Sequence, residues 1–273
     1  MSLPVPTTLS PSKISAFKHC PLAFRFSVID RLPEPPSPAA SKGTLVHRAL
    51  ELLMLRPPGE RRLDAALADL ERAHRELREH PEFSGLGLTE EEAGAFQADA
   101  AELVRRYFLL EDPARVRAIG LELLISIQVG NLTLRGIIDR LDLDADGQLV
   151  VTDYKTGTAP APGFEQDRLG GVHFYSLLCE RLLGRRPSRV QLLYLSTPEV
   201  LSFSPSEQSV GAMERRALAL YAAVERACQR DDFRPHRSRL CEWCNFRAYC
   251  PAWGGDPAGA VELREAAAVL SLA

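Results

Sequence analysis

The chain has 273 residues, with 33 Lys and Arg against 36 Asp and Glu for a formal net charge of −3, and 45% of its residues are hydrophobic. These values are typical of a soluble, folded protein that buries a core without disulfide support. The near-neutral charge argues against a broadly basic nucleic-acid coat, although it leaves room for a local basic groove.

No stretch approaches the roughly 18 consecutive apolar residues that a membrane span needs. The N-terminus also lacks the basic-then-apolar pattern of a secretion signal. We therefore expect a cytoplasmic protein with no membrane partner.

The first part of the chain is predicted to be mostly helical. Ser10 and Pro11 are typical of a helix start, with the hydroxyl as cap and the proline in the first turn, and this helix ends near Cys20. The proline density of residues 33–38 predicts a loop. Apolar residues at helical spacing then recur from residue 44 to residue 110.

The middle of the chain changes to a strand-like pattern. Residues 119–129, 132–143 and 148–154 are rich in Ile, Val, Leu and Thr, and turn-forming residues separate them. This pattern predicts three antiparallel strands. The elements predicted after them are a helix over 167–183, strands over 189–196 and 199–203, a helix over 205–230, and an Ala-rich tail without assigned function.

The second and third strands carry a cluster of charges. A hairpin loop of two or four residues places Asp139 opposite residue 154 or residue 152, and so beside Asp153. Because side chains alternate along a strand, Asp153 and Lys155 face the same side. Neighbouring carboxylates repel unless a cation joins them, and their hard oxygens suit Mg²⁺ or Mn²⁺. With an ammonium group to orient water and neutralise phosphate charge, the hairpin favours phosphodiester hydrolysis.

Two other interpretations of this hairpin are available. Its charges are also compatible with solvated ion pairs on the surface. The spacing Asp142-x-Asp144-x-Asp146-Gly147 imitates an EF-hand calcium loop, but that loop needs a helix on each side, whereas both flanks are strand-like. We therefore interpret Asp146-Gly147 as a turn.

Three of the six cysteines, Cys241, Cys244 and Cys250, lie close together in the sequence. Three thiolates in a compact loop indicate a metal site that is one ligand short of four, and by position the fourth ligand can come from anywhere. Cys179 and Cys228 fall within predicted helices, and we expect them to be small buried hydrophobic residues.

Together, these motifs resemble the RecB-type branch of the PD-(D/E)XK nuclease superfamily. The matching segments are Gly43-Thr44-x-x-His47, Gly136-Ile137-Ile138-Asp139-Arg140-Leu141-Asp142, Asp153-Tyr154-Lys155-Thr156-Gly157, a helix with Phe174-Tyr175, and Ser12-x-x-Ser15-x-Phe17-x-x-Cys20-Pro21. The resemblance implies an α/β fold of the restriction-endonuclease type, with a central mixed sheet flanked by helices. It implies one domain over 1–253, with a helical insertion at about 57–115, a cysteine segment at 231–253 and a tail at 254–273.

The resemblance also implies roles for individual residues. Asp139, Asp153, His47 and the backbone carbonyl of Tyr154 are implied to hold Mg²⁺ or Mn²⁺. Lys155 is the implied catalytic lysine, and Tyr175 is implied as a further active-site residue. Without the resemblance, a lone helical histidine such as His47 is more often structural. Glu122, on the preceding strand, is a candidate auxiliary acid, but a partly buried or surface glutamate is the preferred interpretation, and it is not included among the site residues.

Cys20-Pro21 followed by the distant cysteine triad resembles the RecB-type nucleases in which a 4Fe-4S cluster joins the two chain ends. The implied cluster ligands are Cys20, Cys241, Cys244 and Cys250, and the cluster would mainly staple the fold. Zinc on the same four thiolates is the alternative, because such sites can hold either metal.

One position departs from the family pattern. The family usually has Gln four residues before the helical tyrosine, where this chain has Gly171, with His173 two residues before Tyr175. Since glycine has no side chain to donate or accept a hydrogen bond, either His173 substitutes, or DNA is positioned differently, or activity is reduced.

Two local basic patches occur despite the negative net charge. They consist of Arg185, Arg186 and Arg189, and of Arg234, His236, Arg237 and Arg239. Each patch is compatible with a bound phosphate backbone or with solvated loop arginines. Phe233 and Trp243 lie near the second patch and are candidates to stack on unpaired bases, although packing in the core explains them equally well.

The function predicted from the sequence is a Mg²⁺-dependent DNA exonuclease that acts on single strands or duplex ends in DNA repair, recombination or processing, with a helicase as a potential partner. The alternative is a weak or inactive DNA-binding or helicase-partner subunit that keeps the nuclease fold. A metal-stapled interaction module without a nucleic-acid function is the third hypothesis.

Overall fold

The structure is a computed structural model that describes residues 2–161, 163 and 169–260. The chain divides into two compact units, the first made of Met1–Pro35, Ile127–Arg135 and Ala212–Ala273, and the second of Pro36–Ser126 and Gly136–Gly211. The single-domain organisation stays a prediction. None of the helices in the described ranges combines the length and the apolar character needed to cross a membrane.

The first unit joins the two ends of the chain. Strand β1 (Thr8–Leu9) pairs in parallel with the start of strand β3 (Leu132–Leu143). Helix α1 (Pro11–His19) begins as predicted, with the Ser10 hydroxyl accepting the Lys13 N–H. Helix α2 (Pro21–Phe24), a π-helix (Arg25–Ile29), most of helix α8 (Glu207–Arg230) and 3₁₀ turns at Arg239–Trp243, Arg247–Tyr249 and Pro251–Trp253 complete this unit.

The second unit contains the predicted run of helices. They are α3 (Pro38–Leu55), α4 (Leu63–Leu77), α5 (Pro81–Ser84) and α6 (Glu90–Tyr107), with 3₁₀ turns at Pro58–Glu60 and Pro113–Arg115. The loop predicted over 33–38 is too long by one residue, because α3 already starts at Pro38. A proline is tolerated there, since the first N–H of a helix has no partner within it.

The second unit also holds the mixed sheet. Its strands are β2 (Ala118–Val129), β3, β4 (Leu149–Lys155), β5 (Arg189–Tyr194) and β6 (Glu199–Phe203). The pair β4–β5 is parallel, β3–β4 and β5–β6 are antiparallel, and β2 pairs with β3. The parallel pair needs a crossover, which contains helix α7 (Leu169–Leu183).

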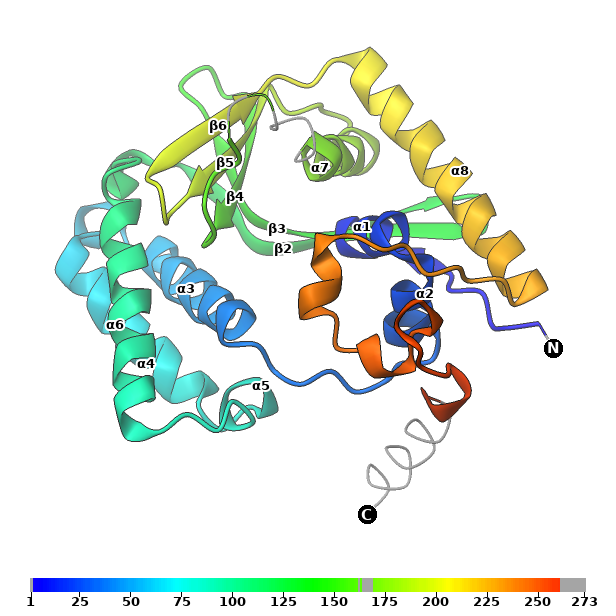
Figure 1. The fold of residues 1–273 in the computed structure, drawn as a ribbon. Coiled ribbons are helices and arrows are strands. Elements are labelled where there is room, and N and C mark those ends of the chain that lie inside the picture. Colours follow the sequence, from blue (N-terminus) through cyan, green and yellow to red (C-terminus); the bar gives the residue numbers. More distant parts are fainter. Residues whose placement is uncertain (1, 162, 164–168, 261–273) are drawn as a thin grey trace. The chain divides into compact units, whose positions relative to one another are not determined.

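Helices flank this sheet, as the predicted fold class requires. Figure 1 shows α3, α4 and α6 packed together and α7 alongside strands β4 to β6. The three packed helices share an apolar core with Tyr154 of β4 and Leu193 of β5. Residues 167 and 168 of the predicted helix, and most of the tail, lie outside the described residues.

The hairpin between β3 and β4 differs from both predicted loops. Arg140 pairs with Thr152 and Leu143 pairs with Leu149, so the loop Asp144–Gln148 has an odd number of residues. The Asp144 carboxylate accepts the N–H groups of Asp146 and Gln148, which holds this longer turn closed. Continuing the observed register by one step places Asp139 opposite Asp153 rather than opposite residue 152 or 154.

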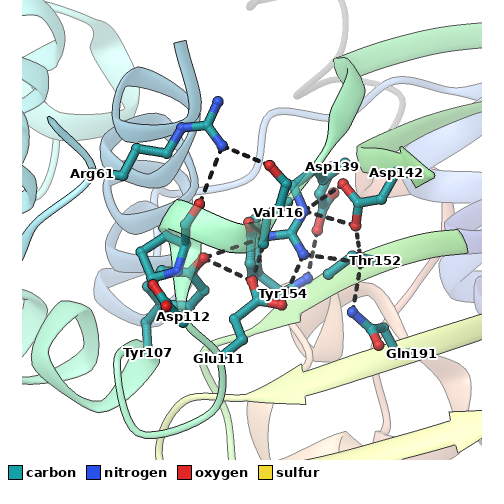
Figure 2. Close-up of polar contacts among 12 residues, drawn as sticks. Arg61, Tyr107, Glu111, Asp112, Val116, Asp139, Asp142, Thr152, Tyr154 and Gln191 are labelled. Atoms are coloured by element: carbon teal, nitrogen blue, oxygen red, sulfur yellow. Dashed lines mark hydrogen bonds and ion pairs between the residues drawn. The ribbon is translucent and has the colours of Figure 1, made fainter. Parts of the chain in front are cut away.

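A buried arginine ties this hairpin to the end of α6. Arg140, only 1% exposed, forms ion pairs with Asp142 at 2.8 Å and with Glu111 at 2.5 Å. It also donates to the Tyr154 hydroxyl at 2.7 Å. Figure 2 shows these partners together with Thr152, which donates to Asp142. Buried charges are tolerated when they are paired and hydrogen-bonded, and every partner named here meets that condition.

We predict that Arg140→Ala lowers the free energy of unfolding by about 3–5 kcal/mol, because it leaves the Glu111 and Asp142 carboxylates without their cation. Urea unfolding measures this change. As a matched control, Arg186→Ala removes a more exposed ion pair with Glu180 and should change stability by about 0–1 kcal/mol. Equal losses in the two variants would show that the Arg140 network does not stabilise the hairpin.

Candidate active site

Side chains from three elements converge beside the hairpin. The ligand atoms of His47 on α3, Glu122 on β2 and Asp139 on β3 all lie within 4.8 Å of one another. His47 Nδ1 is 3.6 Å from Asp139 Oδ2 and 3.9 Å from Glu122 Oε1. His47 Nε2 is 3.1 Å from the backbone oxygen of Tyr154. Since a carbonyl only accepts, Nε2 carries the proton, and the lone pair of Nδ1 faces the two carboxylates.

Strand β4 brings the second aspartate and the lysine to the same place. Lys155 Nζ lies 2.5 Å from Asp153 Oδ2, so the predicted common face of these two side chains is confirmed. The residue between them connects the two strands, because the Tyr154 N–H donates to Asp139 Oδ2 at 2.7 Å, as Figure 2 shows. The structure therefore assembles Asp139, Asp153, Lys155, His47 and the Tyr154 carbonyl in one site.

The pKa values of the site residues are shifted because several acidic side chains lie close together in a buried position. Burial, and then the charge of Asp153, raises the pKa of Asp139 to about 8. Burial, and then the charge of Asp139, raises the pKa of Glu122 to about 7. Burial lowers the pKa of His47, which keeps the imidazole neutral. Burial opposes the charge on Lys155, but Asp153 outweighs it and raises the pKa of the ammonium group.

These groups fit a divalent cation. Carboxylates that repel one another are stabilised by a cation between them, and carboxylate and carbonyl oxygens are the donors that Mg²⁺ and Mn²⁺ prefer. The neutral His47 imidazole adds one nitrogen donor on the same side. Asp139 and Glu122 supply the oxygens near this nitrogen. Asp153 lies on the neighbouring strand, where its Oδ2 pairs with Lys155.

Glu122 belongs to this cluster in the structure, although the sequence did not predict it as a site residue. Its backbone has a φ of +42°, a left-handed conformation that is unfavourable for any residue except glycine. Such a residue interrupts the regular alternation of a strand and redirects a side chain, as strained residues at functional sites often do. A glutamate within the apolar run of residues 118–125 was the signal in the sequence, and alternation alone does not show where it points.

The helix that carries Tyr175 approaches β3 at a glycine. A Cβ atom on Gly136 would lie 2.9 Å from the Tyr175 ring, so the missing side chain makes room for that ring. Burial, and then the charges of Asp153 and Asp139, raises the pKa of the Tyr175 hydroxyl, which places Tyr175 in the field of the site carboxylates. At Gly171, an added Cβ would meet no atom of the described residues within 4 Å.

A cavity of about 480 Å³ opens next to the site. His47 and Glu122 form part of its wall. Gly43 and Thr44 line it as well, which accounts for the place of the Gly43-Thr44-x-x-His47 motif along α3. Of the clustered side chains, His47 and Glu122 are therefore the ones that this cavity reaches.

The remaining candidate ligands lie in the first unit. Cys20, Cys241, Cys244 and Cys250 all line one cavity of about 340 Å³. The backbone N–H of His236 points at Cys20 Sγ, and that of Ser238 points at Cys241 Sγ, each at 3.4 Å. Cys179 and Cys228 are fully buried and do not line this cavity, which confirms the prediction for them.

The mixed sheet with its acidic hairpin defines a protein of the restriction-endonuclease-like class. The chain belongs to the PD-(D/E)XK nuclease superfamily, whose sequence pattern matches residues 8–251. This match covers the acidic hairpin, the preceding helices and all four cysteines of the cavity. No protein among those curated for function matches the chain significantly.

Two solved structures resemble this fold. A crystal structure from Eubacterium rectale, named "Putative exonuclease", is 11% identical in sequence, with a TM-score of 0.52 over 87% of each chain. The crystal structure of SSO0001 is 15% identical, with a TM-score of 0.42 over 92% of this chain and 88% of the other. At an identity of 11%, the similarity to the Eubacterium rectale structure concerns the fold alone.

We predict that this site binds Mn²⁺ and that Glu122→Gln and Asp139→Asn each weaken the binding roughly 10-fold or more, because each removes a charged oxygen donor. Isothermal titration calorimetry measures the dissociation constants. Glu76→Gln is the matched control, since Glu76 pairs with Arg48 and Arg72 outside the cluster and should leave affinity unchanged. An unchanged affinity in Glu122→Gln would remove Glu122 from the ligand set.

Proposed function

We propose that the protein is a metal-dependent DNA nuclease of the RecB type that hydrolyses phosphodiester bonds as an exonuclease. The observation that carries this proposal is the cluster of His47, Glu122 and Asp139, with the Asp153–Lys155 pair on the neighbouring strand and a cavity lined by His47 and Glu122. Membership of the nuclease superfamily supports a phosphodiester as the bond that is broken. The proposal includes a cytoplasmic location, a role in DNA repair, recombination or processing, and delivery of DNA ends by a helicase.

Each residue of the site has a proposed task. The cation is held by Asp139, Asp153, Glu122, the His47 imidazole and the Tyr154 carbonyl. When bound, it supplies positive charge next to the scissile phosphate. The Lys155 ammonium group orients the attacking water and neutralises the charge that develops on the phosphate oxygens. The Tyr175 hydroxyl donates a hydrogen bond to the substrate, and the Tyr154 N–H keeps Asp139 oriented toward the site.

The alternative function is a catalytically weak or inactive DNA-binding subunit, and Gly171 is the observation that favours it. The position offers no side chain where related nucleases have a glutamine. The open space around Gly171 means that a longer side chain can be added there without a clash among the described residues. Because the acidic residues and Lys155 are all present and assembled, we favour an active enzyme.

We also propose that Cys20, Cys241, Cys244 and Cys250 bind a 4Fe-4S cluster that staples the two ends of the chain. Support comes from the cavity that all four thiols line and from the two backbone N–H groups directed at sulfur. Burial, and then the other three thiols, raises the pKa of Cys244, a group that metal coordination would stabilise as a thiolate. Zinc remains the alternative occupant.

Anaerobically purified protein is expected to contain about four irons and four acid-labile sulfides per chain and to absorb visible light, because that is the composition of the cluster. Metal and sulfide analysis measures this. Cys241→Ser should lose the iron, whereas Cys228→Ala, which changes a buried cysteine outside the cavity, should keep it. One zinc per chain without sulfide would establish the alternative metal.

Lys155→Ala is predicted to reduce Mg²⁺-dependent digestion of end-labelled DNA roughly 100-fold or more, since it removes the cation that stabilises the reacting phosphate. Binding of the same DNA should persist, and chelation of the metal should stop digestion by the wild type. Arg105→Ala is the control, because Arg105 lies on the exposed face of α6 beside Glu102.

If the wild type binds DNA but leaves it intact with both Mg²⁺ and Mn²⁺, the inactive-subunit hypothesis holds. Gly171→Gln then tests the cause. Cleavage by this variant would show that the missing glutamine side chain limits activity, and an inactive variant would show that another feature does.

A further inference from the structure

The surface around residues 234–253 of the first unit differs from the rest of the chain. Trp243 is 73% exposed and Trp253 is 44% exposed, although tryptophan is usually well buried. The neighbouring Leu240 is exposed as well. We call the exposed faces of residues 234–253 the tryptophan surface.

The tryptophan surface is basic, unlike the chain as a whole. It contains four arginines, at 234, 237, 239 and 247, against one acid, Glu242. Arg234 is engaged by Asp232. Among the described residues, Arg237, Arg239 and Arg247 form no ion pair within 4.0 Å, so no carboxylate neutralises them. Arg237 does donate a hydrogen bond to the Ala252 carbonyl, which leaves its charge unneutralised.

The two tryptophans of this surface are arranged differently. The guanidinium carbons of Arg247 and Arg237 lie 4.0 Å and 4.8 Å from the centre of the Trp253 ring. These cation–π contacts hold both arginines at the surface. Trp243 makes no ring or cation–π contact with any described residue, and it borders the cysteine cavity while staying 73% exposed, so much of its surface is accessible to a flat partner.

We propose that the tryptophan surface binds single-stranded DNA, with Trp243 stacked on an unpaired base and Arg237, Arg239 and Arg247 against the phosphates. This inference deepens the proposed nuclease function and rests on it for the choice of nucleic acid. An exposed aromatic ring among unpaired arginines matches the two features that single strands present, a free base face and a regular row of negative charges. Bases in a duplex are already stacked, and a single strand is therefore the better fit.

The other candidates from the sequence fit this role less well. Phe233 is only 6% exposed and packs in an apolar core with Phe26 and Phe246, so it is not available for stacking. In the first basic patch, Arg186 is already paired with Glu180, and Arg185 donates to the Gly147 carbonyl as Arg237 does to a carbonyl of its own segment. The structure thus separates Trp243 from Phe233, the aromatic residue with which the sequence grouped it.

The experiment uses intrinsic fluorescence, because the two tryptophans of this chain both lie on the tryptophan surface. The full-length protein, with its cysteine site loaded, is titrated with oligo(dT) of about 16 nucleotides in the presence of a chelator that prevents cleavage. We expect the emission to be quenched. Trp243→Ala should weaken binding roughly 10- to 100-fold, and Trp243→Phe, which keeps an aromatic ring, should retain most of the affinity.

Salt dependence provides a second readout. Arg239→Ala should lower the slope of log K against log salt by about 0.7, the value expected for one lost phosphate contact on a single strand. Circular dichroism and the metal content of each variant establish that it is folded. Leu109→Ala, which changes an exposed apolar residue of the second unit, is the matched control and should bind like the wild type.

Three results would overturn the proposal. The first is that Trp243→Ala and Arg239→Ala both bind oligo(dT) with wild-type affinity, and the second is that a duplex binds as tightly as oligo(dT) or more tightly. The third is that the protein self-associates with rising concentration, that Trp243→Ala abolishes this self-association, and that oligo(dT) has no effect on it. Failure of the nuclease proposal alone gives a different result from failure of the binding proposal. DNA then stays intact with Mg²⁺, while quenching of the tryptophan emission by oligo(dT) still depends on Trp243.

Discussion

Repulsion between the buried carboxylates of Asp139 and Asp153 is the constraint on which the rest of the site depends. The β3–β4 hairpin brings the two residues together, and burial makes their charges difficult to solvate. Two neighbouring groups reduce this repulsion. Lys155 neutralises Asp153 directly, and the Tyr154 N–H donates to Asp139. A divalent cation is the further partner that would relieve this repulsion, which is the physical basis of the proposed metal site.

Tyr154 connects this site to the supporting structure behind it. Its backbone contacts both Asp139 and His47, while its hydroxyl accepts a hydrogen bond from Arg140. Arg140 in turn is held by the carboxylates of Glu111, in the segment after α6, and of Asp142 on β3. A rigid support of this kind limits how far the proposed metal ligands can move, and catalytic sites need such precision because small displacements slow a reaction strongly.

The two units contribute different chemistry. The second unit contains the carboxylates, the lysine and the cavity beside them, so the proposed hydrolysis needs only its residues. The first unit contains the cysteine cavity and the tryptophan surface, both within the segment that follows α8. If the four cysteines bind a cluster, that cluster also fixes the loop that carries Trp243, because Trp243 lies directly between two of the ligands in sequence, Cys241 and Cys244.

The sequence by itself was sufficient for the motifs whose geometry is local. Strand alternation put Asp153 and Lys155 on one face, and the apolar runs predicted the strands and helices of the mixed sheet. Only the tertiary structure decided what depends on long-range packing or on irregular backbone. The hairpin register changed because Asp144 closes a longer turn, Glu122 joined the site through a left-handed residue that breaks alternation, and Phe233 was buried while Trp243 was left exposed. Patterns of period two or 3.6 carry no information about such events, because they describe regular elements and not the contacts between them.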